Sequence, residues 1–227
     1  MKDFVLAKLA SMRNGYSVCG LVDRRGRVYP LGSDTKVIGA VFEIVTRQVM
    51  AAYADEHDLI LLEPKQQNFY PDFTLMRGED DPAKIAVDVK TTYRRSENAS
   101  FSFTLGSYTS FLNPETESKN IVFPYSEYKQ HWIIGFVYRR IEGKRAADAS
   151  IYSFDELQDI DLPFDDVSVF VQEKWRIAGK LPGSGNTANI GSLRGQLEDF
   201  EAGNGVFSSE EEFEAYWREK GALRRGR

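Results

Sequence analysis

The sequence has little of several residue types that mark common classes of protein. Its 227 residues include one cysteine, Cys19, and two histidines, His57 and His131. A single cysteine excludes disulfides within the chain and cysteine-rich zinc sites, and its apolar neighbours favour a buried thiol over a nucleophile. Neither histidine has a serine or cysteine partner in a recognisable catalytic setting, which argues against triad chemistry and histidine-rich metal sites.

Long apolar runs and an excess of basic charge are also absent. The longest apolar run, residues 131–138, is far shorter than the roughly 20 residues that cross a bilayer. The first residues have no signal-peptide core, so we expect a cytoplasmic protein without a membrane segment. The formal net charge of -5 argues against nonspecific binding of nucleic acid by the whole surface, although a local basic groove is compatible with it.

The sequence does have enough apolar material for a sizeable core. With 42% hydrophobic and 13% aromatic residues, the chain is long enough for one large domain or two closely joined lobes. After an N-terminal helix, the pattern predicts a strand hairpin within residues 16–29. A long helix follows, from a cap at Ser33 or Asp34 to about Glu56.

The remaining pattern predicts a mixed sheet followed by a second lobe. The predicted strands of the central sheet are residues 59–62, 73–76, 85–90, 101–104 and 132–138. From Asp155 onward, we expect short strands at 167–171 and 175–178, and then a helix that begins at Ser208 or Ser209 with a capping box. This change of pattern predicts a separate lobe after residue 155.

Two carboxylates and an amine stand on neighbouring predicted strands. Asp72 follows Pro71 just before one strand, and Asp88 and Lys90 lie in the run 85–90. Because side chains alternate along a strand, Asp88 and Lys90 share one face and the apolar residues of the run share the other. Carboxylates bind hard cations such as Mg²⁺, and a nearby ammonium steadies a phosphate, so the set suits phosphodiester hydrolysis. A surface ion pair explains Asp88 and Lys90 equally well at this point.

Three further features have both a non-functional and a functional interpretation. Glu43 shares the polar side of the long helix with Lys36 and Arg47, where it is either solvated or turned toward the metal site. The loop at 181–189 lacks the ending of a phosphate loop and is either an ordinary surface loop or, since Asn and Thr suit base edges, a DNA contact. The amides of the loop at 63–68 meet either bases or water.

Six ordered stretches closely resemble the EcoRV family of type II restriction endonucleases, in the PD-(D/E)xK nuclease superfamily. They are residues 29–37, 63–68, 70–75, 88–93, 131–135 and 183–187, within a likeness that runs from about residue 16 to about residue 217. The resemblance implies an α/β fold, with a mixed central β-sheet flanked by helices. It implies a single restriction endonuclease domain, 1–227, in which about 16–58 form a smaller dimerisation subdomain and about 59–227 a catalytic and DNA-binding subdomain.

The resemblance also implies roles for individual residues. Asp72 and Asp88 match metal-binding carboxylates, Lys90 matches a catalytic lysine, and Glu43 matches an auxiliary acid at the metal site. Lys36 is expected to support the dimer and metal region. The positions expected to contact DNA are Gly183, Ser184, Gly185, Asn186 and Thr187 in a major-groove recognition loop, Gln66, Gln67 and Asn68 on the minor-groove side, and Thr91, Thr92, Ser110, Lys119 and Asn189 at the backbone.

The implied enzyme is a homodimeric, site-specific deoxyribonuclease that acts on double-stranded DNA beside a cognate DNA methyltransferase. It would use Mg²⁺, with Mn²⁺ as a substitute, and in-line attack by a metal-activated water would leave a 5′-phosphate and a 3′-hydroxyl. Since the recognition loop matches residue for residue, we expect a central blunt cut in GATATC. The alternative is a sequence-specific DNA-binding protein with reduced or lost cleavage. A structure-selective repair nuclease ranks last, because it has no use for the two recognition loops.

Overall fold

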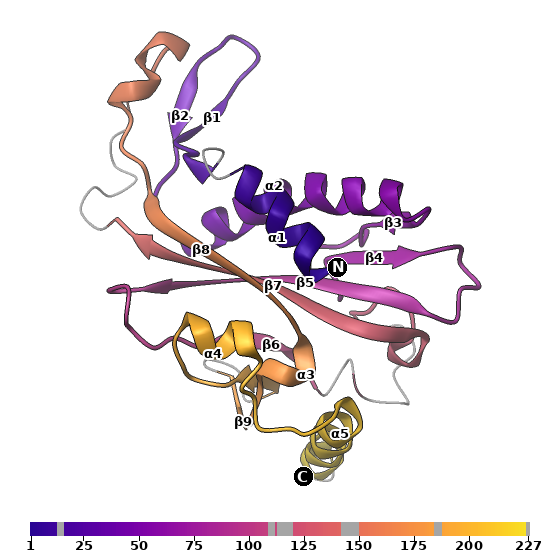
Figure 1. Ribbon diagram of the computed structural model, residues 1–227. Helices are drawn as coiled ribbons and strands as arrows, with labels where there is room; N and C mark the ends of the chain where they lie inside the picture. Colours follow the sequence, from indigo (N-terminus) through magenta and orange to yellow (C-terminus); the bar gives the residue numbers. More distant parts are fainter. Residues whose placement is uncertain (13–15, 109–111, 113–119, 142–149, 184–187, 226–227) are drawn as a thin grey trace.

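The computed structural model describes residues 1–12, 16–108, 112, 120–141, 150–183 and 188–225 (Figure 1). The helices are α1 (Lys2–Ser11), α2 (Thr35–Glu56), α3 (Lys174–Ile177), α4 (Leu197–Ala202) and α5 (Glu210–Arg225), with 3₁₀ helices η2 (Tyr125–Glu127) and η3 (Phe154–Asp159). The strands are β1 (Gly20–Val22), β2 (Val28–Pro30), β3 (Ile60–Leu62), β4 (Phe73–Met76), β5 (Lys84–Arg94), β6 (Thr104–Ser107), β7 (Tyr128–Arg140), β8 (Phe164–Glu173), β9 (Ala178–Pro182) and β10 (Asn189–Ser192).

A five-stranded mixed sheet forms the centre of the molecule, in the order β3-β4-β5-β7-β8. Strands β5 and β7 are parallel, and the other neighbours are antiparallel. The predicted mixed central sheet with flanking helices is therefore confirmed.

Helices α1 and α2 cover one face of this sheet (Figure 1). The α2 helix begins as predicted, because the Asp34 side chain accepts hydrogen bonds from the backbone N–H groups of Lys36 and Val37. Its apolar stripe, which includes Ile38 and Phe42, packs on inward-facing residues of the sheet. Burial of that stripe, rather than helix propensity, supplies most of the stability of such a helix.

Among the described helices, α2 alone is long and apolar enough to cross a membrane by length and composition. The test does not distinguish such a span from a core helix, and 44% of the most apolar window of α2 is buried inside the protein. Its packing on the central sheet accounts for that apolar composition.

A second layer covers the opposite face. A three-stranded sheet in the order β6-β10-β9 lies there with α4 and α5. Its core joins Ala86 and Ile133 of the central sheet to Phe200 of α4 and Trp217 of α5.

The structure differs from the sequence-based prediction in this second layer. The strand predicted at 101–104 lies instead at 104–107, and it joins the three-stranded sheet rather than the central one. Residues 175–178, predicted as a strand, form most of α3, a single helical turn that redirects the chain from β8 into β9. Since β8 completes the central sheet, the C-terminal part of the second layer begins after β8 and not at Asp155, and β6 adds an earlier segment of the chain to it.

The β1–β2 hairpin is present as predicted and projects from the body of the protein (Figure 1). Its turn has Gly26 at a φ of 77°, a conformation that glycine adopts without strain. Cys19, just before this hairpin, is partly exposed, so the prediction of a buried thiol is wrong.

Candidate active site

The site forms where β5 continues past its shorter neighbour. Strand β4 pairs only with residues 85–87 of β5, whereas β7 pairs along the whole length of β5. Asp72 lies immediately before β4, and its Oδ2 accepts a hydrogen bond of 2.6 Å from the backbone N–H of Val89. The Asp72 carboxylate thus binds the backbone of β5 just past the end of the β4 ladder, next to Asp88.

Asp88 and Lys90 form an ion pair on the same face of β5. Asp88 is only 3% exposed, and the Lys90 ammonium also donates to the Val89 carbonyl at 3.2 Å. Burial acts to lower the pKa of Lys90, but the attraction of Asp88, Asp72 and Glu43 outweighs it and raises the pKa above its usual value. Lys90 is therefore a cation at neutral pH, able to donate to a phosphate oxygen.

The acids around Lys90 repel one another. Burial and the charge of Asp88 raise the pKa of Asp72 well above its usual value, against the opposing effects of Lys90 and the Val89 N–H. Burial also raises the pKa of Glu43 on α2, with Lys90 opposing and Asp88 adding to the shift. Asp72, Asp88 and Glu43 thus place three carboxyl groups around one ammonium, an oxygen-rich set that suits a divalent cation such as Mg²⁺.

A cavity of about 130 Å³ opens beside these acids. Residues from three separate segments line it: Gln67, Asn68, Phe69, Tyr70, Asp72, Asp88, Lys90 and Gly106. Gln67 and Asn68 of the polar loop thus lie next to the carboxylates, Gln66 is not among the lining residues, and β6 of the second layer closes the cavity at Gly106. A ligand in this space touches the acids and the loop together.

Comparisons with known proteins show the family of the chain. A family model for the restriction endonuclease EcoRV matches residues 12–225. The type II restriction enzyme EcoRV of Escherichia coli is 50% identical over 203 residues, which are 89% of this chain and 82% of that protein. The chain belongs to the EcoRV family of restriction endonucleases. It is accordingly an enzyme of the type II restriction endonuclease class, a site-specific deoxyribonuclease.

One more distant likeness is to a solved structure, the NlaIV restriction endonuclease. The two are 12% identical with a TM-score of 0.41, and the likeness covers 100% of this chain and 86% of that one.

Other positions that the EcoRV family resemblance singled out are spread over both faces of the sheet. Thr92 follows Asp88 and Lys90 on the cavity side of β5, because side chains two and four residues apart share a face. Thr91 lies on the opposite face, where a Cβ placed on Gly39 of α2 would be 3.5 Å from its hydroxyl. Lys36 is exposed in the first turn of α2 and is not among the residues that line the cavity.

The predicted recognition loop of this EcoRV family member connects β9 to β10. Gly183 donates a backbone hydrogen bond of 2.9 Å to the Asn189 carbonyl, which closes the base of the loop. A Cβ on Gly183 would lie 2.8 Å from the Thr104 hydroxyl, so the close approach of β6 requires glycine there. Ser184, Gly185, Asn186, Thr187, Ser110 and Lys119 lie outside the described residues.

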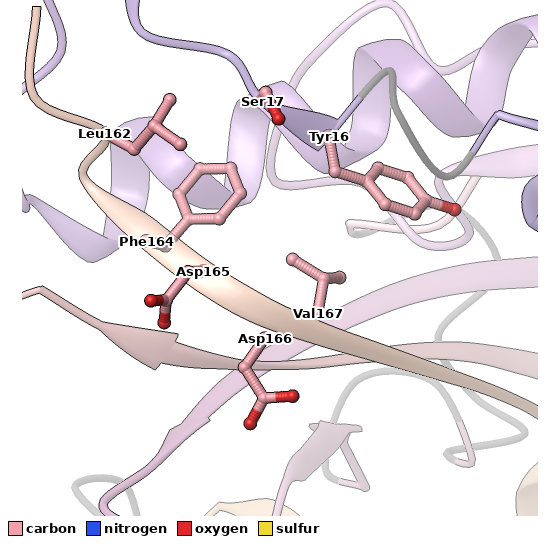
Figure 2. Close-up of a pocket in the computed structure, with 7 residues that line it drawn as sticks. All are labelled: Tyr16, Ser17, Leu162, Phe164, Asp165, Asp166 and Val167. Carbon is pink, nitrogen blue, oxygen red and sulfur yellow. The ribbon is translucent and has the colours of Figure 1, made fainter.

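A second cavity, of about 270 Å³, lies beside the first residues of β8, an edge strand of the central sheet, and is lined by Tyr16, Ser17, Leu162, Phe164, Asp165, Asp166 and Val167 (Figure 2). Figure 2 shows both carboxylates on the side of β8 away from the Phe164 ring. Asp165 is paired with Arg139 at 2.5 Å, and Asp166 with Arg94 at 3.1 Å. Both acids are therefore engaged in ion pairs that hold strands together.

Sequence reasoning missed Lys174, a buried lysine close to the site. Its ammonium lies 4.4 Å from the centre of the Tyr70 ring, and burial lowers its pKa to about 8, with Asp88 acting in the opposite direction. Nothing in the sequence pattern connects Lys174 with Tyr70, because the two meet only after α3 turns the chain beneath the sheet. A buried cation so near Asp88 adds to the positive field at the cavity.

Proposed function

We propose that this protein cuts both strands of GATATC at its centre, as a Mg²⁺-dependent homodimer, and leaves blunt ends with a 5′-phosphate and a 3′-hydroxyl. The observation that carries the proposal is the set of Asp72, Asp88 and Lys90 on one cavity, in a chain 50% identical to a type II restriction enzyme. Mn²⁺ is expected to substitute for Mg²⁺, because both are hard cations that accept carboxylate oxygens.

In this proposal Asp72 and Asp88 bind the metal, with Glu43 as an auxiliary acid. Mg²⁺ supplies activation of the attacking water and neutralises charge on the phosphate. Lys90 donates to a phosphate oxygen and holds the Asp88 carboxylate, since its elevated pKa keeps it protonated. The hydrogen bond from the Val89 N–H orients Asp72 before any ligand binds. Lys36 of α2 is proposed to support the dimer and metal region.

DNA recognition is proposed to use two loops on one face. The loop Gly183–Thr187 would read base edges in the major groove, and Gln66, Gln67 and Asn68 would lie on the minor-groove side. Support comes from the position of Gln67 and Asn68 at the cavity and from the β9–β10 hairpin on the same face of the sheet. Thr91, Thr92, Ser110, Lys119 and Asn189 are proposed to contact or orient the DNA backbone.

The homodimer is proposed to form through the segment 16–58. The projecting hairpin exposes apolar side chains there: Leu21 is 60% exposed, Val22 55% and Tyr29 37%. An exposed apolar patch on a projecting element is typical of an interface. Two-fold symmetry of such a dimer would match a palindromic site and bring one cavity to each strand.

The test is digestion of a plasmid that carries one GATATC, followed by sequencing of the ends. We expect blunt cutting with Mg²⁺ and none with Ca²⁺. Asp88→Ala should lose at least about 10³-fold in rate, since a catalytic metal supplies several kcal/mol of transition-state stabilisation. Asp80→Ala, a change of an exposed acid on the β4–β5 turn, is the matched control and should cut normally.

Each result bears on a different part of the proposal. Uncut plasmid with Mg²⁺, combined with tight binding of the GATATC duplex, would favour the DNA-binding protein over the enzyme. Cuts at another sequence would refute GATATC as the recognition site but would support Mg²⁺-dependent DNA cleavage. Leu21→Ser with Val22→Ser should shift the protein from dimer to monomer in sedimentation, and an unchanged dimer would refute the hairpin interface.

A further inference from the structure

Three side chains of metal-ligand type lie together on the cavity side of the central sheet. His131 is on β7, in register with Ala86 of β5, and Glu210 and Glu214 lie in the first turns of α5. One ring nitrogen of His131 and one carboxylate oxygen of each glutamate all lie within 4.8 Å of one another. Glutamates four residues apart lie on one side of a helix, so both face the end of β7.

His131 offers an unused nitrogen to this cluster. The residue is 3% exposed, and its Nε2 is buried without a hydrogen-bond partner among the described residues. Its Nδ1 lies 2.6 Å from the Tyr70 hydroxyl, and its ring stacks on Tyr125 at 4.1 Å between centroids. Burial lowers the pKa of His131 well below its usual value. The ring is therefore held in place as a neutral imidazole, and in the tautomer with its proton on Nδ1 the lone pair of Nε2 is available to a ligand.

The two glutamates lie close together and are partly buried. Burial and the charge of Glu214 raise the pKa of Glu210 to about 7, and burial also raises the pKa of Glu214. Three cations act on them, and one of these, Lys129, acts on Glu214. Arg218 pairs with Oε2 of Glu214 at 2.9 Å on the outer side of α5, and the buried Lys174 attracts both acids. The Arg218 side chain of this pair is 43% exposed, so the pair is weak, and it uses only one of the two Glu214 oxygens.

We propose that His131 Nε2, Glu210 and Glu214 bind one divalent transition-metal ion of the Zn²⁺ class. One imidazole and two carboxylates are a ligand set that Zn²⁺ accepts, at bond lengths of about 2.0–2.2 Å. Tetrahedral ligands at that distance are roughly 3.4 Å apart, so rotation of the two glutamate side chains completes the site. Imidazole nitrogen favours Zn²⁺ over Mg²⁺, which separates this site from the all-oxygen set at Asp72 and Asp88.

The ion would link α5 to β7 and restrict the motion of His131 and of Tyr70, which lies next to the active site. With Nε2 on the metal, Nδ1 carries the proton and donates it to the Tyr70 hydroxyl, the outer hydrogen bond that histidine ligands commonly make. Tyr70 precedes Pro71 and Asp72 in the chain and lines the cavity. The inferred role is structural, and it holds whatever sequence the enzyme cuts.

The test uses protein freed of metal, in a background with Asp72→Asn and Asp88→Asn so that the active site does not compete for Zn²⁺. Calorimetric titration should show one equivalent of Zn²⁺ bound. The melting temperature should rise by about 5 °C or more when free Zn²⁺ is at about a hundred times its dissociation constant. Co²⁺ in place of Zn²⁺ should give the visible absorption of a tetrahedral site. None of these measurements depends on DNA cleavage, so failure of the proposed function would not affect them.

Two matched variants in that background decide the outcome. Glu210→Gln with Glu214→Gln should lose the Zn²⁺ equivalent and the thermal shift. Glu211→Gln with Glu219→Gln removes the same charge from exposed positions of the same helix and should keep both. The first variant removes repulsion between partly buried acids, so its metal-free melting temperature should not fall. Equal Zn²⁺ binding by the two variants, or no binding in the background protein, would overturn the proposal.

Discussion

The two faces of the central sheet differ in chemistry although the same strands form both. Val87, Val89 and Phe136 point toward α1 and α2 and pack in an apolar layer. The buried polar side chains of the described strands all lie on the other face by strand alternation: Thr74, Lys84, Asp88, Arg94, His131 and Gln172. One face is therefore built for stability, and the other holds charge that the fold must compensate.

The polar face of the central sheet is where this protein tolerates unfavourable electrostatics. A buried charge without compensation is costly, and Asp72 and Asp88 on the polar face, together with Glu43 of α2, surround Lys90. The apolar face supplies the stability that permits this crowding. Functional sites often carry such a cost, since stability and activity make different demands on the same residues.

The largest effect on stability is expected on the apolar face. Leu75 of β4 is fully buried, so Leu75→Ala should lower the free energy of unfolding by about 2–5 kcal/mol. Urea unfolding measures this, with Ile60→Ala on the neighbouring strand, where Ile60 is 50% exposed, as the control. Cleavage per folded molecule should stay near that of the unchanged protein. A tenfold loss of cleavage would show that the two faces are not separable.

A smaller effect of opposite sign is expected at Asp72. The pKa of Asp72 is raised in the folded, metal-free protein. Ionisation of Asp72 therefore lowers the free energy of unfolding progressively as the pH rises above about 3.9, the pKa of an aspartate in the unfolded chain. Asp72→Asn removes that cost and should raise the melting temperature at pH 8 by about 2–4 °C, the equivalent of roughly 1 kcal/mol, but by less at pH 5. Thermal scans without metal test this.

Asp80→Asn serves as the control for Asp72→Asn, since Asp80 is exposed on the same hairpin. The same raised pKa predicts that protons compete with Mg²⁺ at low pH, so the Mg²⁺ concentration for half-maximal cleavage should fall as pH rises. A gain of stability that is equal at pH 5 and pH 8 would contradict the electrostatic explanation.

The smallest effect is expected for the ion pair between Arg139 and Asp165. Its two hydrogen bonds are short, but the Arg139 side chain is 55% exposed. Arg139→Ala should therefore lower the free energy of unfolding by about 0.2–1 kcal/mol, and the loss should shrink in high salt. Urea titrations at two salt concentrations measure both. A loss of more than about 2 kcal/mol in the free energy of unfolding would show that this ion pair stabilises β8 more than the exposure of Arg139 suggests.

Local pattern predicted much of the fold. The cap and stripe of α2, the β1–β2 hairpin and strand β4 were expected from the sequence and are observed. The alternation in β5 also predicted that Asp88 and Lys90 share a face. The roles of these residues, of Glu43 and of the DNA-contacting positions stay predictions, because they rest on resemblance to a family and not on contacts with a ligand.

The sequence by itself determined which residues alternate, which positions cap helices and which family the chain resembles, because these depend on neighbours within a few positions. Only the tertiary structure decided that 174–177 is a turn of helix, that β6 joins a second sheet, and that β4 ends where Asp72 binds the edge of β5. It also brought His131 to Glu210 and Glu214 across 79 residues of chain or more. Such contacts arise from the packing of layers, and spacing along a chain does not encode them.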